Sequence, residues 1–382
     1  MPRSHAVRRT PGRLADDREI IYFDDTEPFL SGEQTRELVD KRALGPAAQA
    51  GQMRRDPLSG AWIAMATHRL GRTFMPPADE CPLCPTGRGT EPSEIPAQDY
   101  DVVVFENRFP SYSTRSGAES GGAEGIHGIW AHAPAVGRCE VVCFTSDHNA
   151  TFADLDPSRV RTVIEAWADR TAELSRMPEV AQVFPFENRG REIGVTLQHP
   201  HGQIYGYPLV TPRTGTMLAR AAEYRERTGR LLLRDVLDSE RSDGSRMVLE
   251  ARHWSAYVPY AARWPVEVHL APHRDVADLT ELGGDERDEL ALVYLDLLRR
   301  LDRYYVDDDG GRLRLPYIAG WHQAPAREGR DLCRLHLQVT SVLRAPGKLK
   351  YLAGSESGMG AWVNDTTPER IAARLRDVAS AS

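Results

Sequence analysis

The sequence predicts an α+β fold made of two repeats of one unit, each an antiparallel sheet with packing helices. The chain has 382 residues, enough for two domain-sized units or one duplicated architecture. Hydrophobic residues make up 41% of it, which supports a sizeable core. The order strand, strand, helix, strand and a strand with a His-x-[His/Gln] pattern occurs in both halves. We interpret this recurrence as an internal duplication.

Charge and composition narrow the classes of function. The net charge of −7 argues against a broad nucleic-acid-binding surface. No run approaches the roughly 18 apolar residues of a membrane span, and no apolar segment follows the arginines of residues 1–13. We therefore expect neither a membrane helix nor a secretory signal. Five cysteines, an odd number, do not make a disulfide framework, and a cytoplasmic enzyme is predicted.

The first half is predicted to follow an N-terminal extension over residues 1–50, which has no assigned function and one candidate strand at residues 19–23. A turn at residues 56–60 leads into an apolar run. Asp156 and Pro157 have the residue types of a helix N-cap and first turn, and apolar residues then recur at helical spacing. Strands are expected to start near residues 102, 140 and 180.

The second half is expected to repeat this order from about residue 213. We place one domain over residues 51–212 and the other over residues 213–382. The elements expected in the second are a helix over 219–233, strands near 253–260 and 266–270, a helix over 285–303, strands near 317–322 and 335–340, and a last helix capped at Thr367.

The most informative segment is Gln198-His-Pro-His-Gly-Gln-Ile-Tyr205. In an extended chain, side chains alternate between faces, so His199, His201, Gln203 and Tyr205 would share one face. Proline has no N–H for a sheet ladder, so Pro200 predicts an edge strand or a strand end. Such a row could bind a metal, attack phosphorus, or simply be a polar strand face.

This segment resembles the active-site signature of the galactose-1-phosphate uridylyltransferases, within the histidine-triad superfamily of nucleotide transferases and hydrolases. The resemblance extends over roughly residues 54–375. It implies that both repeats are histidine-triad-like and that residues 51–212 form the catalytic domain. It further implies that His201 is the covalent nucleophile and that His199 is a zinc ligand.

A zinc site is expected around Cys81 and Cys84. A lone C-x-x-C is ambiguous between zinc, redox chemistry and no function, although no thioredoxin-like unit surrounds it. A structural zinc needs two further ligands. The resemblance supplies them as His148 and His199, and implies one zinc per chain.

A second metal site, which some members of the resembled family hold, is expected to be empty. His322 and His336 match two of its ligands, but Gln338 stands where a third histidine would be. Met217 stands at the acidic position, and Glu223 competes for it only if a gap is allowed. Because a carboxamide is a poor transition-metal ligand beside imidazole, we interpret the two histidines as polar packing residues.

Substrate-binding residues are implied by the same resemblance, although strand-end turns and exposed basic loops have similar compositions. Arg69 and Arg72 would contact nucleotide phosphates in the neighbouring subunit's site, since arginine suits bidentate binding of phosphate. Lys350 would meet the sugar phosphate, and Glu356 would accept hydrogen bonds from sugar hydroxyls. The other implied residues are Asn107 and Phe109 in a uridine-pocket loop, Asn188, Gly194 and Thr196 in a phosphate loop, and Tyr351 and Ala353 beside Lys350. Leu197-Gln198 departs from the family's usual Asn-Pro.

The predicted function is exchange of UMP between UDP-glucose and galactose 1-phosphate, by a ping-pong mechanism through uridylyl-His201, as in galactose metabolism. Gln203 would hold a phosphate oxygen of that intermediate. A homodimer with shared active sites is implied. Two alternatives remain. One is a transferase or phosphorylase for another nucleotide, such as ADP-glucose or a dinucleoside polyphosphate. The other is a non-catalytic, zinc-stabilised binding protein.

Overall fold

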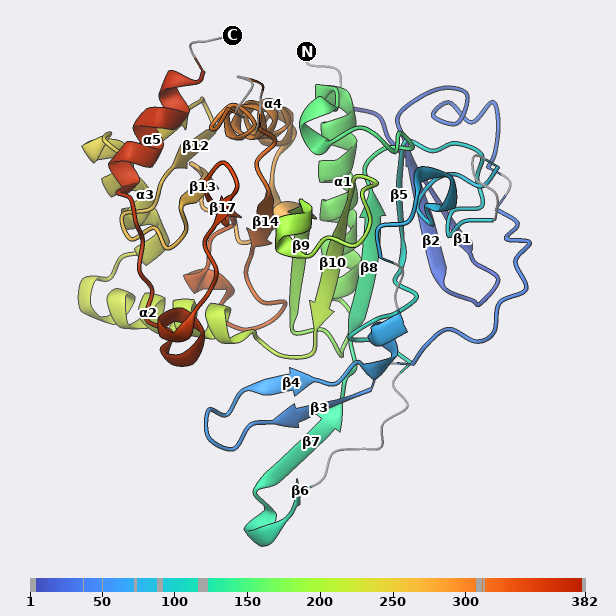
Figure 1. Ribbon diagram of the computed structural model, residues 1–382, viewed down its shortest axis with the longest axis horizontal. Helices are drawn as coiled ribbons and strands as arrows, with labels where there is room; N and C mark the ends of the chain where they lie inside the picture. The colour runs from blue at the N-terminus through green and yellow to red at the C-terminus, as the bar shows by residue number, and fades with distance from the viewer. Residues whose placement is uncertain are drawn as a thin grey trace.

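A single sheet of eleven strands runs through the molecule (Figure 1). This computed structural model describes residues 5–36, 38–49, 51–71, 74–87, 92–115, 123–306, 311 and 313–379. The strands, in spatial order, are β1 (Arg8–Arg13), β2 (Glu19–Asp24), β5 (Val102–Glu106), β8 (Arg138–Cys143), β10 (His201–Tyr207), β9 (Gln182–Arg189), β14 (Tyr317–His322), β15 (His336–Ser341), β13 (Val266–Pro272), β12 (Trp254–Tyr257) and β11 (Met247–Glu250).

The predicted α+β fold with two repeats of antiparallel strands is confirmed. The spatial order β5-β8-β10-β9 in the first half matches β12-β13-β15-β14 in the second, and all these pairings are antiparallel. One long helix follows the second strand of each set: α1 (Pro157–Ser175) and α4 (Gly284–Leu301). Strands β9 and β14 pair with each other, which joins the halves into one sheet.

Helices α1 and α4 contact each other and bury apolar side chains from both halves in a common core. Asp156 is the N-cap of α1 and Pro157 its first residue, as predicted. An aromatic cluster joins the halves, because Trp167 of α1 contacts Tyr294 of α4 and Trp321 of β14. This shared core holds the strand ends of the two repeats in fixed relative positions.

The N-terminal extension predicted over residues 1–50 supplies two strands to the main sheet. Strand β2 pairs with β5, and β1 pairs with β2. Ile20, Ile21, Tyr22 and Phe23 are buried, so this segment forms one edge of the first half. The domain boundaries after residues 50 and 212 stay predictions.

A second sheet of four strands projects from the body of the molecule (Figure 1). Its strands are β4 (Trp62–Ala64), β3 (Gln52–Arg55), β7 (Trp130–Pro134) and β6 (Ala123–Glu124), in that spatial order. The large apolar side chains of Leu58, Ile63, Ile126, Ile129 and Trp130 are exposed on it and its connecting loops. The projecting sheet therefore exposes several large apolar side chains, as surfaces that bind another molecule commonly do.

The single helix predicted over residues 219–233 is wrong: two helices occupy this region, α2 (Pro212–Thr228) and α3 (Leu232–Asp243). Gly229 between them has φ of 70°, a left-handed conformation that ends α2. The remaining elements are the hairpin β16 (Leu343–Ala345) and β17 (Lys348–Leu349), and α5 (Pro368–Asp377), which Thr367 caps as predicted. In the described part of the chain, no helix has the length and apolar composition needed to cross a membrane.

Candidate active site and metal centre

The predicted motif lies at the start of strand β10, in the interior of the main sheet. Strand β10 pairs with β8 on one side and β9 on the other, so Pro200 marks a strand end and not an edge strand. Gly202 faces the helix layer, where a Cβ atom would lie 2.9 Å from Phe144 Cζ. Gly202 is thus required by packing beneath the sheet, and His201 and Gln203 share the opposite face.

His201 is held by a single backbone contact. Its Nδ1 lies 2.7 Å from the carbonyl oxygen of His199, so an Nδ1–H donor leaves the Nε2 lone pair available. Burial lowers the pKa of His201, which favours the neutral imidazole. Within the described residues, Nε2 has no hydrogen-bond partner. A neutral imidazole with an open Nε2 can act as a nucleophile at neutral pH.

The second repeat contains an equivalent histidine, His336, whose Nε2 already has a partner. His336 begins β15 as His201 begins β10, and its Nδ1 lies 3.0 Å from the carbonyl oxygen of Arg334. Its Nε2 is occupied, because Gln338 Nε2 lies 3.0 Å away. Burial lowers the pKa of His336 to about 3. His336 is therefore a neutral packing residue whose nucleophilic atom is covered.

The candidate ligands of the second metal site, which the sequence predicts to be empty, gather only in part: His322 and His336 are neighbours, but Glu223 is paired elsewhere. His322 stacks on His336 with ring centroids 5.2 Å apart, and Arg213 of α2 donates to Gln338 Oε1 at 2.5 Å. Glu223 is exposed and paired with Arg220, with 2.8 Å between the charged atoms. A guanidinium bound to Gln338 and two neutral histidines, whose pKa values are lowered by desolvation, disfavour a cation here.

His201 lines a pocket of about 140 Å³ at the end of β9 and β10. This volume is smaller than the about 300–1,000 Å³ typical of small-molecule sites. The lining residues are Met75, Ala150, Thr151, Glu187, Asn188, Arg189, Gly190, Arg191, Val195, Leu197, Gln198, His199, Pro200 and His201. Asn188 therefore lines the same pocket as the candidate nucleophile, His201. So does Leu197-Gln198, the pair that stands where the resembled family usually has Asn-Pro.

A buried ionic network supports the pocket from the helix side of the sheet. Arg189 donates to Asp302 Oδ2 at 3.1 Å and to the Leu315 carbonyl at 2.6 Å. Tyr317 donates its hydroxyl hydrogen to Glu187 Oε2 at 2.9 Å. Burial raises the pKa of Glu187 to about 7. The network connects β9 with β14 and so fixes the strand that carries Asn188.

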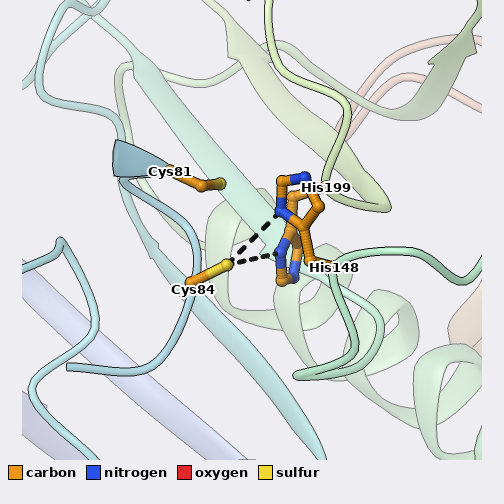
Figure 2. A group of neighbouring side chains, drawn as sticks. All are labelled: Cys81, Cys84, His148 and His199. Carbon is orange, nitrogen blue, oxygen red and sulfur yellow. Dashed lines mark hydrogen bonds between the residues drawn. The ribbon is translucent and has the colours of Figure 1, made fainter. Parts of the chain in front are cut away.

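The four predicted zinc ligands come together from three separate parts of the chain (Figure 2). Donor atoms of Cys81, Cys84, His148 and His199 all lie within 4.8 Å of one another. Cys84 Sγ is 3.4 Å from His148 Nδ1 and 3.6 Å from His199 Nδ1. Tetrahedral zinc, at about 2.3 Å from sulfur and about 2.0–2.1 Å from nitrogen, separates such atoms by about 3.5 Å. The residues present therefore fit zinc.

Neighbouring groups orient His199 toward this cluster. Its Nε2 lies 2.8 Å from the Thr145 carbonyl oxygen, so an Nε2–H donor leaves Nδ1 for a metal. The Tyr100 hydroxyl is 2.7 Å from the same Nε2 and donates to the Leu83 carbonyl. Sequence reasoning missed Tyr100, because a tyrosine 99 residues before its partner gives no local signal.

The predicted phosphate ligand Arg69 and the uridine-pocket loop lie outside this pocket. Arg69 is on a 3-10 turn (Thr67–Gly71), not at a strand end, and donates to the Ser111 hydroxyl. Arg72 lies outside the described residues. Asn107 Oδ1 accepts a hydrogen bond from the Phe109 amide at 2.9 Å. In one chain Arg69, Asn107 and Phe109 do not line the pocket of His201.

The predicted phosphate loop follows β9 directly. Gly194 has φ of 78° and ends a 3-10 turn (Arg191–Ile193), which suits a glycine. The Thr196 carbonyl accepts a hydrogen bond from the Met75 amide at 2.8 Å. Sequence reasoning missed Arg191, which lines the pocket between Asn188 and Gly194. A signal for Arg191 was available in the sequence, because two arginines flank Gly190 inside a segment already predicted to bind phosphate.

The predicted sugar-phosphate loop is also outside the pocket of its own chain. Lys350 Nζ lies 3.2 Å from Glu356 Oε1, and Lys350 also donates to the Val363 carbonyl. Tyr351 is 76% exposed and Ala353 is exposed as well. Lys350, the candidate phosphate ligand, and Glu356, the candidate acceptor from sugar hydroxyls, are therefore ion-paired with each other.

Comparisons with known proteins return the same family for both halves of the chain. Residues 39–211 match the family described as galactose-1-phosphate uridyl transferase, N-terminal domain, and residues 218–381 match its C-terminal domain. The chain is 47% identical to a galactose-1-phosphate uridylyltransferase of Streptomyces lividans, over 98% of each chain. It is 33% identical to one of Thermotoga maritima, over 85% of this chain and 98% of that protein.

Solved structures show the same architecture. A uridylyltransferase structure, 33% identical, superposes with a TM-score of 0.75 over 86% of this chain and 99% of that one. An ADP-glucose phosphorylase of Arabidopsis thaliana, 21% identical, superposes with a TM-score of 0.62 over 85% of this chain and 98% of that one. At that identity the second likeness concerns the fold alone.

Proposed function

Because the chain belongs to the galactose-1-phosphate uridyl transferase family, we propose that it exchanges the uridylyl group between UDP-glucose and galactose 1-phosphate through a covalent bond to His201. One observation carries the assignment to this residue. His201 lines the pocket and its Nε2 has no hydrogen-bond partner among the described residues, whereas the equivalent atom of His336 lies 3.0 Å from Gln338 Nε2.

The proposed reaction has two in-line displacements at one phosphorus atom. Nε2 of neutral His201 attacks the α-phosphorus of UDP-glucose, and the bond to the β-phosphate oxygen breaks, releasing glucose 1-phosphate. A phosphate oxygen of galactose 1-phosphate then attacks the uridylyl group, the P–N bond breaks, and UDP-galactose leaves. No proton has to be moved, because both leaving groups are already weak bases.

The chain's own groups would stabilise the intermediate. The bond that joins His201 Nε2 to phosphorus makes the ring cationic, and the His199 carbonyl accepts a hydrogen bond from Nδ1–H at 2.7 Å. Gln203 shares the face of His201 and can donate a hydrogen bond to a phosphate oxygen without acting as a proton shuttle. Asn188 would contact the nucleotide from the end of β9.

We also propose one zinc per chain, held by Cys81, Cys84, His148 and His199. When bound, zinc would supply a structural cross-link and no reaction step. The His199 side chain would be fixed by that cross-link, while its carbonyl orients the His201 ring. The site would thereby couple folding of the C-x-x-C segment to the position of the nucleophile.

A homodimer with shared active sites would complete the pocket. In one chain the pocket is small and lacks Arg69 and the loop over residues 350–356. The projecting sheet has exposed Trp130, Ile126 and Ile129, which a partner could cover. A two-fold dimer is the commonest closed assembly and would supply both missing groups from the partner.

We place this enzyme in the cytoplasm. All five cysteines are buried free thiols, and two of them are candidate metal ligands that must stay reduced. A reducing compartment preserves thiols in that state.

The test is intact-mass analysis after incubation with UDP-glucose, followed by peptide mapping of the adduct. The expected result is one uridylyl group per chain on His201, which galactose 1-phosphate removes with formation of UDP-galactose. Parallel incubations with ADP-glucose and a dinucleoside tetraphosphate test other nucleotides. An adenylyl adduct without a uridylyl one would refute the substrate, and an adduct on another residue would refute the nucleophile. Finding no adduct with any nucleotide would favour a binding protein.

A further inference from the structure

The charged side chains around the pocket differ in whether they already have a hydrogen-bond or ion-pair partner. Three charged residues line it: Glu187, Arg189 and Arg191. Arg189 is committed to Asp302 and to the Leu315 carbonyl, and Glu187 is buried beneath the sheet with Tyr317. Neither of these two is available to a ligand that enters from solvent.

Arg191 is different, because it is exposed and has no partner among the described residues. It begins the 3-10 turn between Gly190 and Gly194, which have φ of 105° and 78°. A Cβ atom at Gly190 would lie 2.6 Å from Pro316 Cβ, so the turn is packed closely against the second half. The carboxylate of Glu192 turns back toward Gly190 and does not neutralise Arg191. An unpaired cation is therefore held on a fixed turn at the rim of the pocket.

We infer that Arg191 binds the phosphate of the hexose 1-phosphate, which is the β-phosphate of the bound nucleotide sugar. This inference rests on the proposed function and assigns a further residue to it. Attack by His201 requires the α-phosphorus to lie at Nε2 inside the pocket. The β-phosphate, which follows it in the nucleotide sugar, would then lie at the rim. A guanidinium always carries its charge and binds two phosphate oxygens at once.

Arg191 would act in both half-reactions. As the bond from the α-phosphorus breaks, negative charge accumulates on the departing hexose phosphate, and a cation beside it stabilises the transition state. The same contact would orient galactose 1-phosphate for the reverse displacement. Arg69 and Lys350, implied earlier for phosphate contacts, lie outside this pocket in the same chain, so Arg191 supplies a cation without a partner subunit.

Binding measurements can separate the two phosphates. UMP has only the α-phosphate, whereas UDP and UDP-glucose also have the β-phosphate. Titration calorimetry with the Arg191→Gln protein should show UDP and UDP-glucose bound about 10- to 100-fold more weakly than by the unmodified protein, as expected for one charged hydrogen-bonded contact. UMP affinity should stay within twofold.

Kinetics supply the second readout. Arg191→Gln should raise KM for galactose 1-phosphate and lower kcat, and Arg191→Lys should recover part of both, since it restores the charge without the planar fork. Arg176→Gln is the matched control, because Arg176 is also exposed but lies past the end of α1, paired with Glu173. It should change none of these values.

Two results would overturn the inference: unchanged UDP affinity in Arg191→Gln, or equal weakening of UMP and UDP. Failure of the proposed function is distinguishable, since the unmodified protein would then form no uridylyl adduct. An unmodified protein that forms the adduct, beside an Arg191→Gln protein with unchanged binding, refutes the role of Arg191 alone.

Discussion

At the residue scale, His201 of the first repeat can be compared directly with His336 of the second. Both repeats have a histidine at the start of a strand, a carbonyl contact to Nδ1, and a glutamine two residues later. In the second repeat the glutamine caps Nε2, and His336 is only 6% exposed. In the first repeat, His201 lines a pocket instead. The proposed nucleophile His201 therefore differs from the packing residue His336 by one hydrogen bond and by its place in a pocket.

The paired substitutions His201→Ala and His336→Ala should separate these roles. His201→Ala should lower uridylyl exchange at least about 10⁴-fold, because the covalent route is lost, with little change in melting temperature. His336→Ala should keep exchange within a few-fold and lose about 1–3 kcal/mol of unfolding free energy. Exchange assays and thermal unfolding of both proteins check this. An active His201→Ala protein would contradict the assignment.

At the element scale, the pairing of β9 with β14 both joins the repeats and supports the pocket. The buried carboxyl of Glu187 lies at this joint, with the Tyr317 hydroxyl as donor. Its ordinary pKa of 4.5 is raised to about 7 by burial, so the folded state holds this proton more tightly than the unfolded state. The stability it contributes is fully present below about pH 4.5 and is lost as pH rises through about 7.

Replacing this carboxyl should remove that pH dependence. Glu187→Gln keeps the shape and a hydrogen-bonding side chain but has no proton to lose. We expect its unfolding free energy, relative to the unmodified protein, to increase between pH 5 and pH 8, at about 1.4 kcal/mol per unit of pKa difference. Denaturant unfolding across this range measures it. Glu192→Gln, an exposed change in the neighbouring turn, should show no such trend, and a flat difference for Glu187→Gln would contradict the prediction.

The C-x-x-C segment shows how a metal could stabilise an element with little regular structure. Cys84→Ser should lower the zinc content measured by elemental analysis from about one per chain to well below one, and the melting temperature by about 5–10 °C. Cys333→Ser is the matched control, because Cys333 is also a buried free thiol but lies outside the cluster. Equal zinc content in the two variants would show that the cluster does not bind zinc.

At the scale of the whole molecule, one chain places the proposed nucleophile, His201, and the implied phosphate ligands Arg69 and Lys350 in separate regions. Arg69 and the loop over residues 350–356 do not reach the pocket of their own chain. The projecting sheet and that loop expose apolar side chains, including Trp130 and Leu352. A dimer that covers these surfaces would bring both groups to the partner's His201.

Mixing two inactive proteins tests this arrangement. If sites are shared, Arg69→Ala and His201→Ala subunits can form a mixed dimer in which one site has both an intact Arg69 and an intact His201. After subunit exchange, the mixture should recover up to about a quarter to a half of normal activity, as expected for one intact site per mixed dimer. Each variant incubated alone should stay inactive. A fully active monomer in sedimentation would refute the shared site.

The sequence by itself determined the repeated order of elements, the helix capped by Asp156, and the segment that carries His201. These features follow from local rules: apolar spacing, capping residues and side-chain alternation along a strand. The break at Gly229 was equally local, but it was missed because a glycine inside a helical pattern is tolerated until the backbone adopts positive φ.

Only the tertiary structure decided which distant groups meet. It brought Cys81, Cys84, His148 and His199 within 4.8 Å, whereas the sequence implied this set only through resemblance. It placed residues 8–24 in the main sheet and left Arg191 as the unpaired cation of the pocket, among the residues described. Contacts of this kind depend on strand order and register across the whole sheet, and no spacing along the chain encodes them locally.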